Sequence, residues 1–121
     1  MKAFINFSGH PYAQWSQNQK DAAAVYGEVI DVPFPAVPAD ATSDDIKELS
    51  GLYVARISDM DPSAVMCQGE FTLAFAVAQG LMAQGITVMA ACSERKTTEV
   101  VKSGTTQKIS VFEFIQFRNY V

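Results

Sequence analysis

The chain has 121 residues, of which 49% are hydrophobic and 18% are charged, with 13 acidic against 9 basic residues. This length and composition predict one globular domain and leave no room for a second. The net charge of −4 repels a nucleic-acid backbone, so we exclude duplex nucleic acid as a partner. No window approaches the roughly 18 consecutive apolar residues of a membrane span, so we expect no membrane partner either.

The two cysteines, Cys67 and Cys92, stand at the ends of apolar runs. A domain of this size buries enough surface to fold without a disulfide or a metal. In such runs a reduced thiol acts as a small hydrophobic side chain. We therefore expect a reducing, cytoplasmic compartment.

The first half of the chain alternates short apolar runs with segments of helical period, a pattern typical of βα units in a mostly parallel sheet. We expect strands over residues 3–7 and 29–32, with a helix between them that Ser16 caps and Gly27 ends. Three prolines follow the second strand and force an extended connection, because each one fixes its own φ. These are Pro33, Pro35 and Pro38.

The second half continues this alternation and ends in a different pattern. Thr42 or Ser43 caps the next helix. The elements that follow are a strand over residues 64–67, a helix over about 71–83 that is apolar almost all round, and a strand over 86–92. Residues 97–102 and 108–117 are rich in β-branched and aromatic side chains, and Ser103-Gly104-Thr105 between them predicts a hairpin. The pattern indicates an α/β fold with a four-stranded, mostly parallel sheet and a C-terminal antiparallel β-hairpin.

We expect the functional site at the carboxyl ends of the parallel strands, where ligands of open α/β sheets bind. Four expected loops reach this edge: residues 8–11, 33–35, 68–72 and 93–96. The chain has no Gly-rich phosphate loop and no Gly-x-Gly-x-x-Gly turn, which excludes a P-loop NTPase and a dinucleotide dehydrogenase. One histidine and two separated cysteines give no zinc motif, so we expect neither metal nor cofactor.

His10, Arg95 and Lys96 are the candidate catalytic side chains. His10 could act as a general acid or base, could donate a hydrogen bond to a phosphate, or could simply cap local backbone. Arg95 and Lys96 could stabilise charge on a phosphoryl group, or could be the solvated base of the hairpin.

The loop over residues 68–72 offers a second set of candidates. Gly69 would let a ligand approach the backbone at the start of a helix, and the Thr72 hydroxyl lies in the first turn; the alternative is an ordinary strand-to-helix turn. Glu70 could be the partner of the helix dipole, which we favour, or could orient a ribose hydroxyl.

The first loop contributes Ser8, which could bind a phosphate oxygen or only end its strand. Asn6 lies within a buried run and needs a polar partner in either case. Tyr12 and Trp15 could stack on a base, but they could equally pack against the first helix.

The hairpin carries more aromatic side chains than one covered face can bury: Phe112, Phe114, Phe117 and Tyr120. We therefore expect part of its surface to be buried against another subunit.

Two segments resemble a known family: Asn6-Phe7-Ser8-Gly9-His10-Pro11 and Gln68-Gly69-Glu70-Phe71-Thr72, the second opening an apolar helix. They are similar to the small CRISPR-associated relatives of CARF domains, which include the standalone ring nucleases of type III systems. CARF domains often have a Gly-Thr-Lys-like turn where this chain has Gly69-Glu70-Phe71-Thr72, so the lysine is missing here. The resemblance implies a three-layer, Rossmann-like, CARF-like domain over residues 1–121, with the βα core over 1–95 and the hairpin over 96–121.

The resemblance also implies a homodimer that binds cyclic oligoadenylate at its two-fold axis and cleaves it without metal. In this interpretation a ribose 2′-hydroxyl attacks the adjacent phosphate, Arg95 or Lys96 stabilises the transition state, and His10 protonates the leaving oxygen. The implied ligand-binding residues are Asn6, Ser8, Gly9, Gln68, Gly69, Glu70, Thr72, Ser93 and Glu94.

Three other interpretations stay open at this point. The domain could capture the cyclic nucleotide without cutting it, as a sink or a sensor. It could be a small enzyme of nucleotide metabolism, with Glu70 or Glu94 as its reactive carboxylate. It could also be a dimeric interaction protein whose loops bind no ligand.

Overall fold

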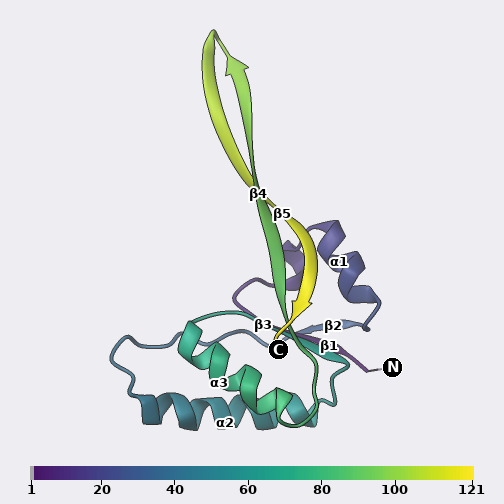
Figure 1. Cartoon of the computed structure of the whole chain (residues 1–121), viewed down its shortest axis with the longest axis vertical. Helices are drawn as coiled ribbons and strands as arrows, with labels where there is room; N and C mark the ends of the chain where they lie inside the picture. The colour runs from purple at the N-terminus through teal and green to yellow at the C-terminus, as the bar shows by residue number, and fades with distance from the viewer. Residues whose placement is uncertain (1) are drawn as a thin grey trace.

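The computed structural model describes residues 2–121 and has a mixed α/β architecture (Figure 1). Its sheet has five strands in the order β2-β1-β3-β4-β5. The strands are β1 (Phe4–Phe7), β2 (Val29–Asp31), β3 (Ala64–Cys67), β4 (Val88–Lys102) and β5 (Thr105–Asn119). The first four are parallel, and β5 pairs antiparallel with β4.

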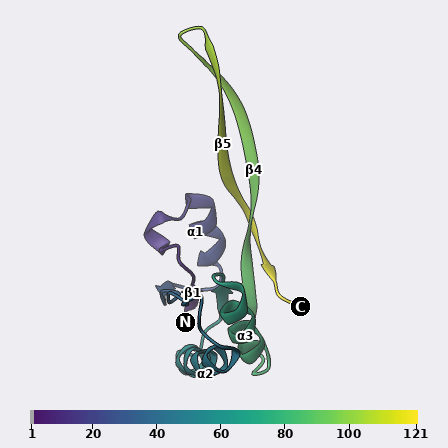
Figure 2. The same ribbon diagram turned by 90° about the vertical axis from the view of Figure 1, so that its left-hand side faces the viewer.

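Helices cover both faces of the sheet (Figures 1 and 2). On one face, α1 (Gln17–Ala24) and the short 3₁₀ turn before it (Tyr12–Gln14) enclose a cluster that contains Phe4, Trp15 and Met66. On the other face, α2 (Ser43–Asp59) and α3 (Phe71–Met82) pack on a larger cluster of alternate strand residues. Within residues 2–121, no helix combines the length and the hydropathy needed to cross a bilayer.

Several local predictions are confirmed because short-range chemistry determines them. Ser16 caps α1 by accepting a hydrogen bond from the Gln19 N–H. Thr42 and Asp45 form a reciprocal capping box at the start of α2. The buried strand β3 begins and ends where its apolar run does.

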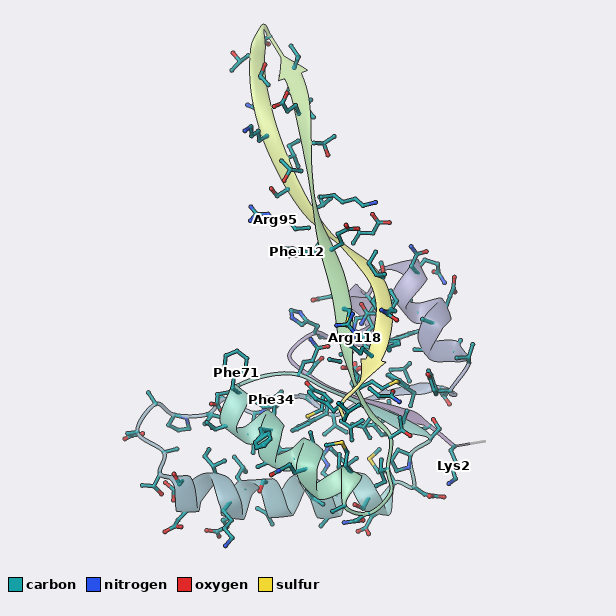
Figure 3. The ribbon with its side chains drawn as sticks, in the orientation of Figure 1. Lys2, Phe34, Phe71, Arg95, Phe112 and Arg118 are labelled. Atoms are coloured by element: carbon teal, nitrogen blue, oxygen red, sulfur yellow. The ribbon has the colours of Figure 1, made fainter. Side chains whose placement is uncertain are left out.

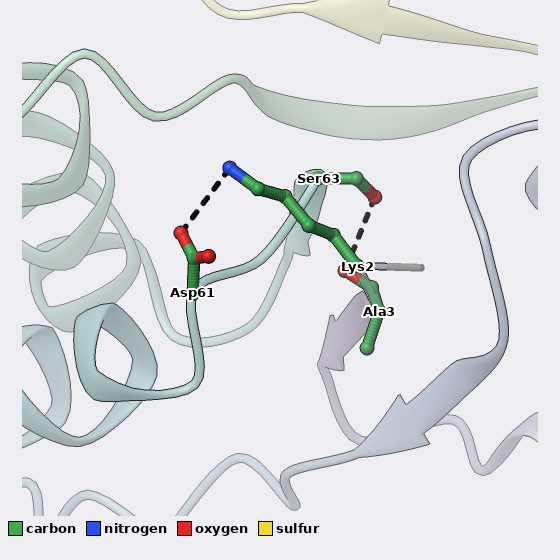
Figure 4. Close-up of polar contacts among 4 residues, drawn as sticks. All are labelled: Lys2, Ala3, Asp61 and Ser63. Carbon is green, nitrogen blue, oxygen red and sulfur yellow. Dashed lines mark hydrogen bonds and ion pairs between the residues drawn. The ribbon is translucent and has the colours of Figure 1, made fainter.

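The amino ends of the strands form turns that lie away from the expected site. The Lys2 ammonium pairs with the Asp61 carboxylate at 3.2 Å, and the Ser63 hydroxyl donates to the Ala3 carbonyl at 3.1 Å (Figure 4). Gly27 has a φ of 140°, and a Cβ there would collide with the Lys2 carbonyl oxygen. As expected, this edge consists of turns and surface charges.

The prediction of a loop over residues 93–96 is wrong, because β4 continues through them to Lys102. The sheet therefore has five strands, and β4 is itself the first strand of the hairpin. Strand β3 pairs with β4 only at Val88 and Met89, so beyond Met89 only β5 lies beside β4. The two strands leave the body as a twisted ribbon (Figures 1 and 2). Ser103 and Gly104, both with positive φ, close it as a tight turn, as predicted.

The expectation that α3 is buried almost all round is also wrong. Leu73, Val77 and Leu81 are fully buried, but Phe71 is 89% exposed and Phe75 is 61% exposed. The helix packs against α2 and the sheet with one side, and its other side borders an open hollow of about 270 Å³ that Tyr120 and Val121 also line. Figure 3 shows Phe71 at the upper end of α3, pointing outward.

Candidate functional site

The carboxyl ends of β1 and β3 and the part of β4 just beyond its pairing with β3 open into a hollow on the α1 side of the sheet. This hollow of about 500 Å³ is lined by His10, Trp15, Gln19, Met66, Gln68, Ala91, Ser93 and Phe112. An adjoining hollow of about 380 Å³ shares five of these residues and extends to Gln14, Ser16 and Phe114. We call the two together the His10 cavity.

A buried hydrogen-bond network holds the loop that carries His10. The Asn6 amide donates to the His10 carbonyl at 2.8 Å and to the Asp31 carboxylate at 2.9 Å. The Ser8 hydroxyl donates to the Asn6 side-chain oxygen at 2.7 Å and accepts from the His10 N–H at 3.2 Å. Asn6 and Ser8 are only 1% and 4% exposed. These two side chains thus stabilise the loop from inside, and the Ser8 hydroxyl points into this network.

The His10 backbone is fixed from a second side, because the Trp15 indole N–H also donates to its carbonyl at 3.0 Å. Trp15 therefore packs beneath the loop, in edge contact with Phe4 and Tyr12. The backbone carbonyl of His10, and not its ring, accepts these bonds. The imidazole lines both hollows of the cavity.

Gln68 directly follows β3, and Ser93 lies within β4. The Gln68 side-chain oxygen accepts a hydrogen bond from the Ala91 N–H at 2.7 Å, which orients the side-chain NH₂ group as a donor. Ser93 follows a β-bulge at Cys92/Ser93. The extra residue of the bulge is Ile115 of β5, so Ser93 keeps the face of Ala91, two positions earlier, and both residues line the cavity.

Arg95 and Lys96 of β4 lie on opposite faces of the ribbon. Arg95 is directly opposite Phe112, which lines the cavity, so Arg95 belongs to the cavity face. Its guanidinium donates to the Ser110 hydroxyl at 3.3 Å. Figure 3 shows Arg95 and Phe112 close together on the ribbon above the body.

Lys96 and Glu94 belong to the other face, because neighbouring strand residues point to opposite sides. The Lys96 ammonium lies 2.7 Å from the Glu113 carboxylate, and this hydrogen bond and charge raise the pKa of Lys96. Glu94 is directly opposite Glu113. Neither Lys96 nor Glu94 lines the His10 cavity, and Arg95 lies outside its lining too, beside Phe112 on the same face.

The amino terminus of α3 already holds an anion, the carboxylate of Glu70. This group accepts from the Thr72 N–H at 3.0 Å and the Leu73 N–H at 2.9 Å, and the Thr72 hydroxyl also donates to it. These bonds lower the pKa of Glu70, the Leu73 N–H contributing most. The structure thus agrees with the interpretation of Glu70 as the dipole partner, and a phosphate at this helix end would meet a negative charge.

The space beside Gly69 is filled by a side chain of the protein and is not open to a ligand. A Cβ at Gly69 would lie 2.5 Å from the ring of Phe34. Phe34 belongs to the expected loop over residues 33–35 and stacks on Phe7, with ring centroids 4.8 Å apart. Both loops therefore contribute packing here.

Two other hollows are less suited to an anion. A groove of about 470 Å³ beside α2 has three carboxylate residues in its lining, Asp40, Asp45 and Glu48. A smaller hollow of about 190 Å³ adjoins the Asn6 network and Asp31. Among residues 2–121, no three His, Cys, Asp or Glu side chains are grouped as metal ligands.

Sequence reasoning predicted His10, Gln68 and Ser93 at one edge, but it did not predict Gln19 or Phe112 as cavity residues. Gln19 lies on α1, and it was interpreted as part of a buried stripe. The bulge at Cys92/Ser93 shifts the pairing of β4 with β5 by one residue. Phe112 is therefore opposite Arg95, on the strand face that borders the cavity. Cross-strand register of this kind leaves no signal in a single sequence.

Comparison with curated proteins and with solved structures found no similar protein. Comparison with family models found one match, which covers residues 2–118. The matched segment includes the His10 loop, the turn into α3 and both strands of the ribbon. On this match, the chain belongs to the Uncharacterized protein MJ1673 family.

Proposed function

We propose that the protein binds a cyclic oligoadenylate in the His10 cavity and cleaves it as a metal-independent ring nuclease, which would end type III CRISPR signalling. The observation that carries the proposal is the meeting of His10, Gln68 and Ser93, from the loop after β1, the end of β3 and the interior of β4, in one hollow of about 500 Å³. This is where parallel α/β sheets bind ligands, and the volume suits a small-molecule site. The resemblance to CARF-related proteins supplies the ligand class.

The sheet supports the finer assignment to a Rossmann-like domain. Strands β2-β1-β3-β4 are parallel and have helices on both faces, which is a doubly wound arrangement. The two free cysteines, Cys67 and Cys92, support a reducing cytoplasmic environment for the proposed enzyme.

Phe112 and Arg95 would make the main contacts to the ligand. Phe112 is 76% exposed while lining the cavity, so its ring is free to stack on an adenine. Such stacking is worth about 1–3 kcal/mol per base. Arg95 lies next to it on the same face, where its guanidinium can bind a phosphate through two parallel hydrogen bonds. Gln68 and Ser93 add neutral polar contacts.

In the proposed cleavage, the ribose 2′-oxygen forms a bond to the adjacent phosphorus and the bond from phosphorus to the 5′-oxygen breaks. The products are a 2′,3′-cyclic phosphate and a free 5′-hydroxyl. The His10 imidazolium donates the proton to the leaving 5′-oxygen, and the proton of the 2′-hydroxyl passes to water. Arg95 stabilises the charge on the phosphoryl oxygens.

The proposal includes a homodimer. One cavity of about 500 Å³ accommodates a ligand of nucleotide size, whereas a ring of several nucleotides is several times larger. Two cavities related by a two-fold axis could hold opposite parts of one symmetric ring.

Binding is tested by thermal unfolding with cyclic oligoadenylates of several ring sizes. A ligand at 100 times its Kd stabilises the native state by about 2.7 kcal/mol, which raises Tm by several degrees. The matched pair of variants is Arg95→Ala and Lys96→Ala. Arg95→Ala should weaken binding about tenfold or more, because a charged hydrogen bond is lost. Lys96→Ala, on the other face, should leave binding unchanged. No Tm shift with any ring, or equal effects of the two variants, would refute the proposed site.

Cleavage is tested by product analysis at enzyme excess. His10→Ala should still bind the ring but should cleave it at least about 100-fold more slowly, since general acid catalysis contributes this much. Cleavage at the wild-type rate would remove His10 from the mechanism.

A second candidate is a binding module of the same fold that holds the ring intact. One observation favours it: the lining of the His10 cavity contains no Asp, Glu, Lys or second His side chain, so no partner base is in place for the 2′-hydroxyl. An intact ring recovered after prolonged incubation with wild-type protein would decide for this candidate.

A further inference from the structure

The ribbon formed by β4 and β5 beyond Met89 lacks a covering layer. A two-stranded ribbon by itself is only marginally stable in water, and both of its backbone edges can pair with other chains. It also exposes five large apolar side chains: Val101, Ile109, Val111, Phe112 and Ile115, each between 46% and 76% exposed. Some of these lie on each face of the ribbon. Its surface is therefore that of a segment that packs against a partner.

The charge of the ribbon differs in sign from that of the body. Residues 94–118 contain five Lys or Arg and three Glu, a net charge of +2. The remaining residues contain four Lys or Arg and ten Asp or Glu, a net charge of −6. The body of a second copy is thus an acidic partner that complements the ribbon.

The tip of the ribbon and one groove of the body match in more detail. At the tip, exposed Val101 lies near Lys102 and Lys108, and residues 99–108 have a net charge of +1 because they also include Glu99, directly opposite Lys108. The groove beside α2, of about 470 Å³, has Asp40 and Glu48 in its lining. Its apolar part includes Val37, Leu49 and Leu52, the last 65% exposed. The tip and the groove therefore offer each other both an apolar surface and charges of opposite sign.

We propose that the ribbon is an arm whose tip docks in the α2 groove of a second copy of this chain, while that copy's tip docks in the first. The tip and α2 lie at opposite ends of the long axis (Figure 1). A two-fold axis perpendicular to this long axis therefore brings each tip to the α2 groove of the other copy, so that both contacts form together and the dimer is closed. A standard interface buries about 800 Å² per partner, so each arm also lies along the partner's body. The inference specifies the dimer in the proposed function and needs no nucleotide.

The test is sedimentation of the full chain without nucleotide, using charge reversal. Lys102→Glu/Lys108→Glu places negative tips against negative grooves, and Asp40→Lys/Glu48→Lys places positive tips against positive grooves. Each variant alone should have a dimer Kd at least about tenfold above that of the wild type, because every contact occurs twice. Mixed together, the two variants should form a heterodimer with Kd near the wild-type value, since both contacts are again attractive.

The control Lys20→Glu/Arg56→Glu has the same charge change as the tip variant and should dimerise like the wild type. Circular dichroism verifies that each variant is folded. Three results would overturn the inference. The wild type could be monomeric at 100 times the concentration used for ligand binding, the tip variant could have the same dimer Kd as the control, or the two variants could fail to associate on mixing. If the arm fails these tests while a cyclic oligoadenylate still raises Tm, the proposed ligand site stands. If the pairing holds but no ring raises Tm, only the ligand site fails.

Discussion

At the scale of single residues, the two cysteines differ in their surroundings. Cys67 is fully buried at the end of β3, and this burial raises the pKa of its thiol to about 12. Cys92 is partly exposed on β4. Because only the thiolate is nucleophilic, a thiol with so high a pKa is unreactive at pH 8.

Native protein at pH 8 should therefore show one fast-reacting thiol with an aromatic disulfide reagent, and two in denaturant. Cys92→Ser should abolish the fast reaction, and Cys67→Ala should leave it. Two thiols that react equally fast in the native protein would contradict the burial of Cys67.

Gly69 gives the second prediction at this scale. A Cβ there would lie 2.5 Å from the Phe34 ring, which stacks on Phe7 in the core. Gly69→Ala should lower stability by about 1–3 kcal/mol, the usual cost of overpacking. Denaturant unfolding measures this loss. Gly9→Ala is the control, since a Cβ at Gly9 meets no atom within 4 Å. Equal stability of Gly69→Ala and wild type would show that the ring moves aside at no cost.

At the scale of elements, Glu70 couples α3 to pH. Its pKa is lowered in the folded state by hydrogen bonds from the first turn of the helix. The carboxylate therefore stabilises the fold above the ordinary pKa of a glutamate, and this contribution is lost as pH falls through the lowered value. The Tm of the wild type should exceed that of Glu70→Gln at pH 7, and the difference should shrink toward pH 3.

The exposed Glu28→Gln, in the connection before β2, provides the baseline for removing a carboxylate away from a helix end and from the α2 groove. A Tm difference for Glu70→Gln that is the same at both pH values would show that the charge of the cap does not contribute.

The elements also show what a sequence can predict. Helix caps and the buried strand β3 were predicted because their signals lie within a few residues. The length of β4 was not predicted. Residues 93–96 are polar and lie outside the core, so they lack the alternation of apolar and polar residues that indicates a strand. At the candidate site, the predicted ends of β1 and β3 placed His10 and Gln68 correctly at one edge, whereas Ser93 reaches the same hollow from within β4. The separation of Arg95 from Lys96 required the pairing register of a ribbon that only the structure reveals.

At the scale of the whole molecule, the body and the ribbon should differ in stability. Strands β1 and β3 are central in the sheet and buried throughout, whereas each ribbon strand has one neighbour and both faces exposed. Amide hydrogen exchange in the body should therefore be slow at every protein concentration. Exchange in β5 over residues 105–113 should be fast in dilute protein and should slow as the concentration rises, because a docked arm is covered by its partner. Slow exchange in the ribbon at all concentrations would mean that its own cross-strand contacts suffice. Fast exchange at all concentrations would mean that no second copy covers it.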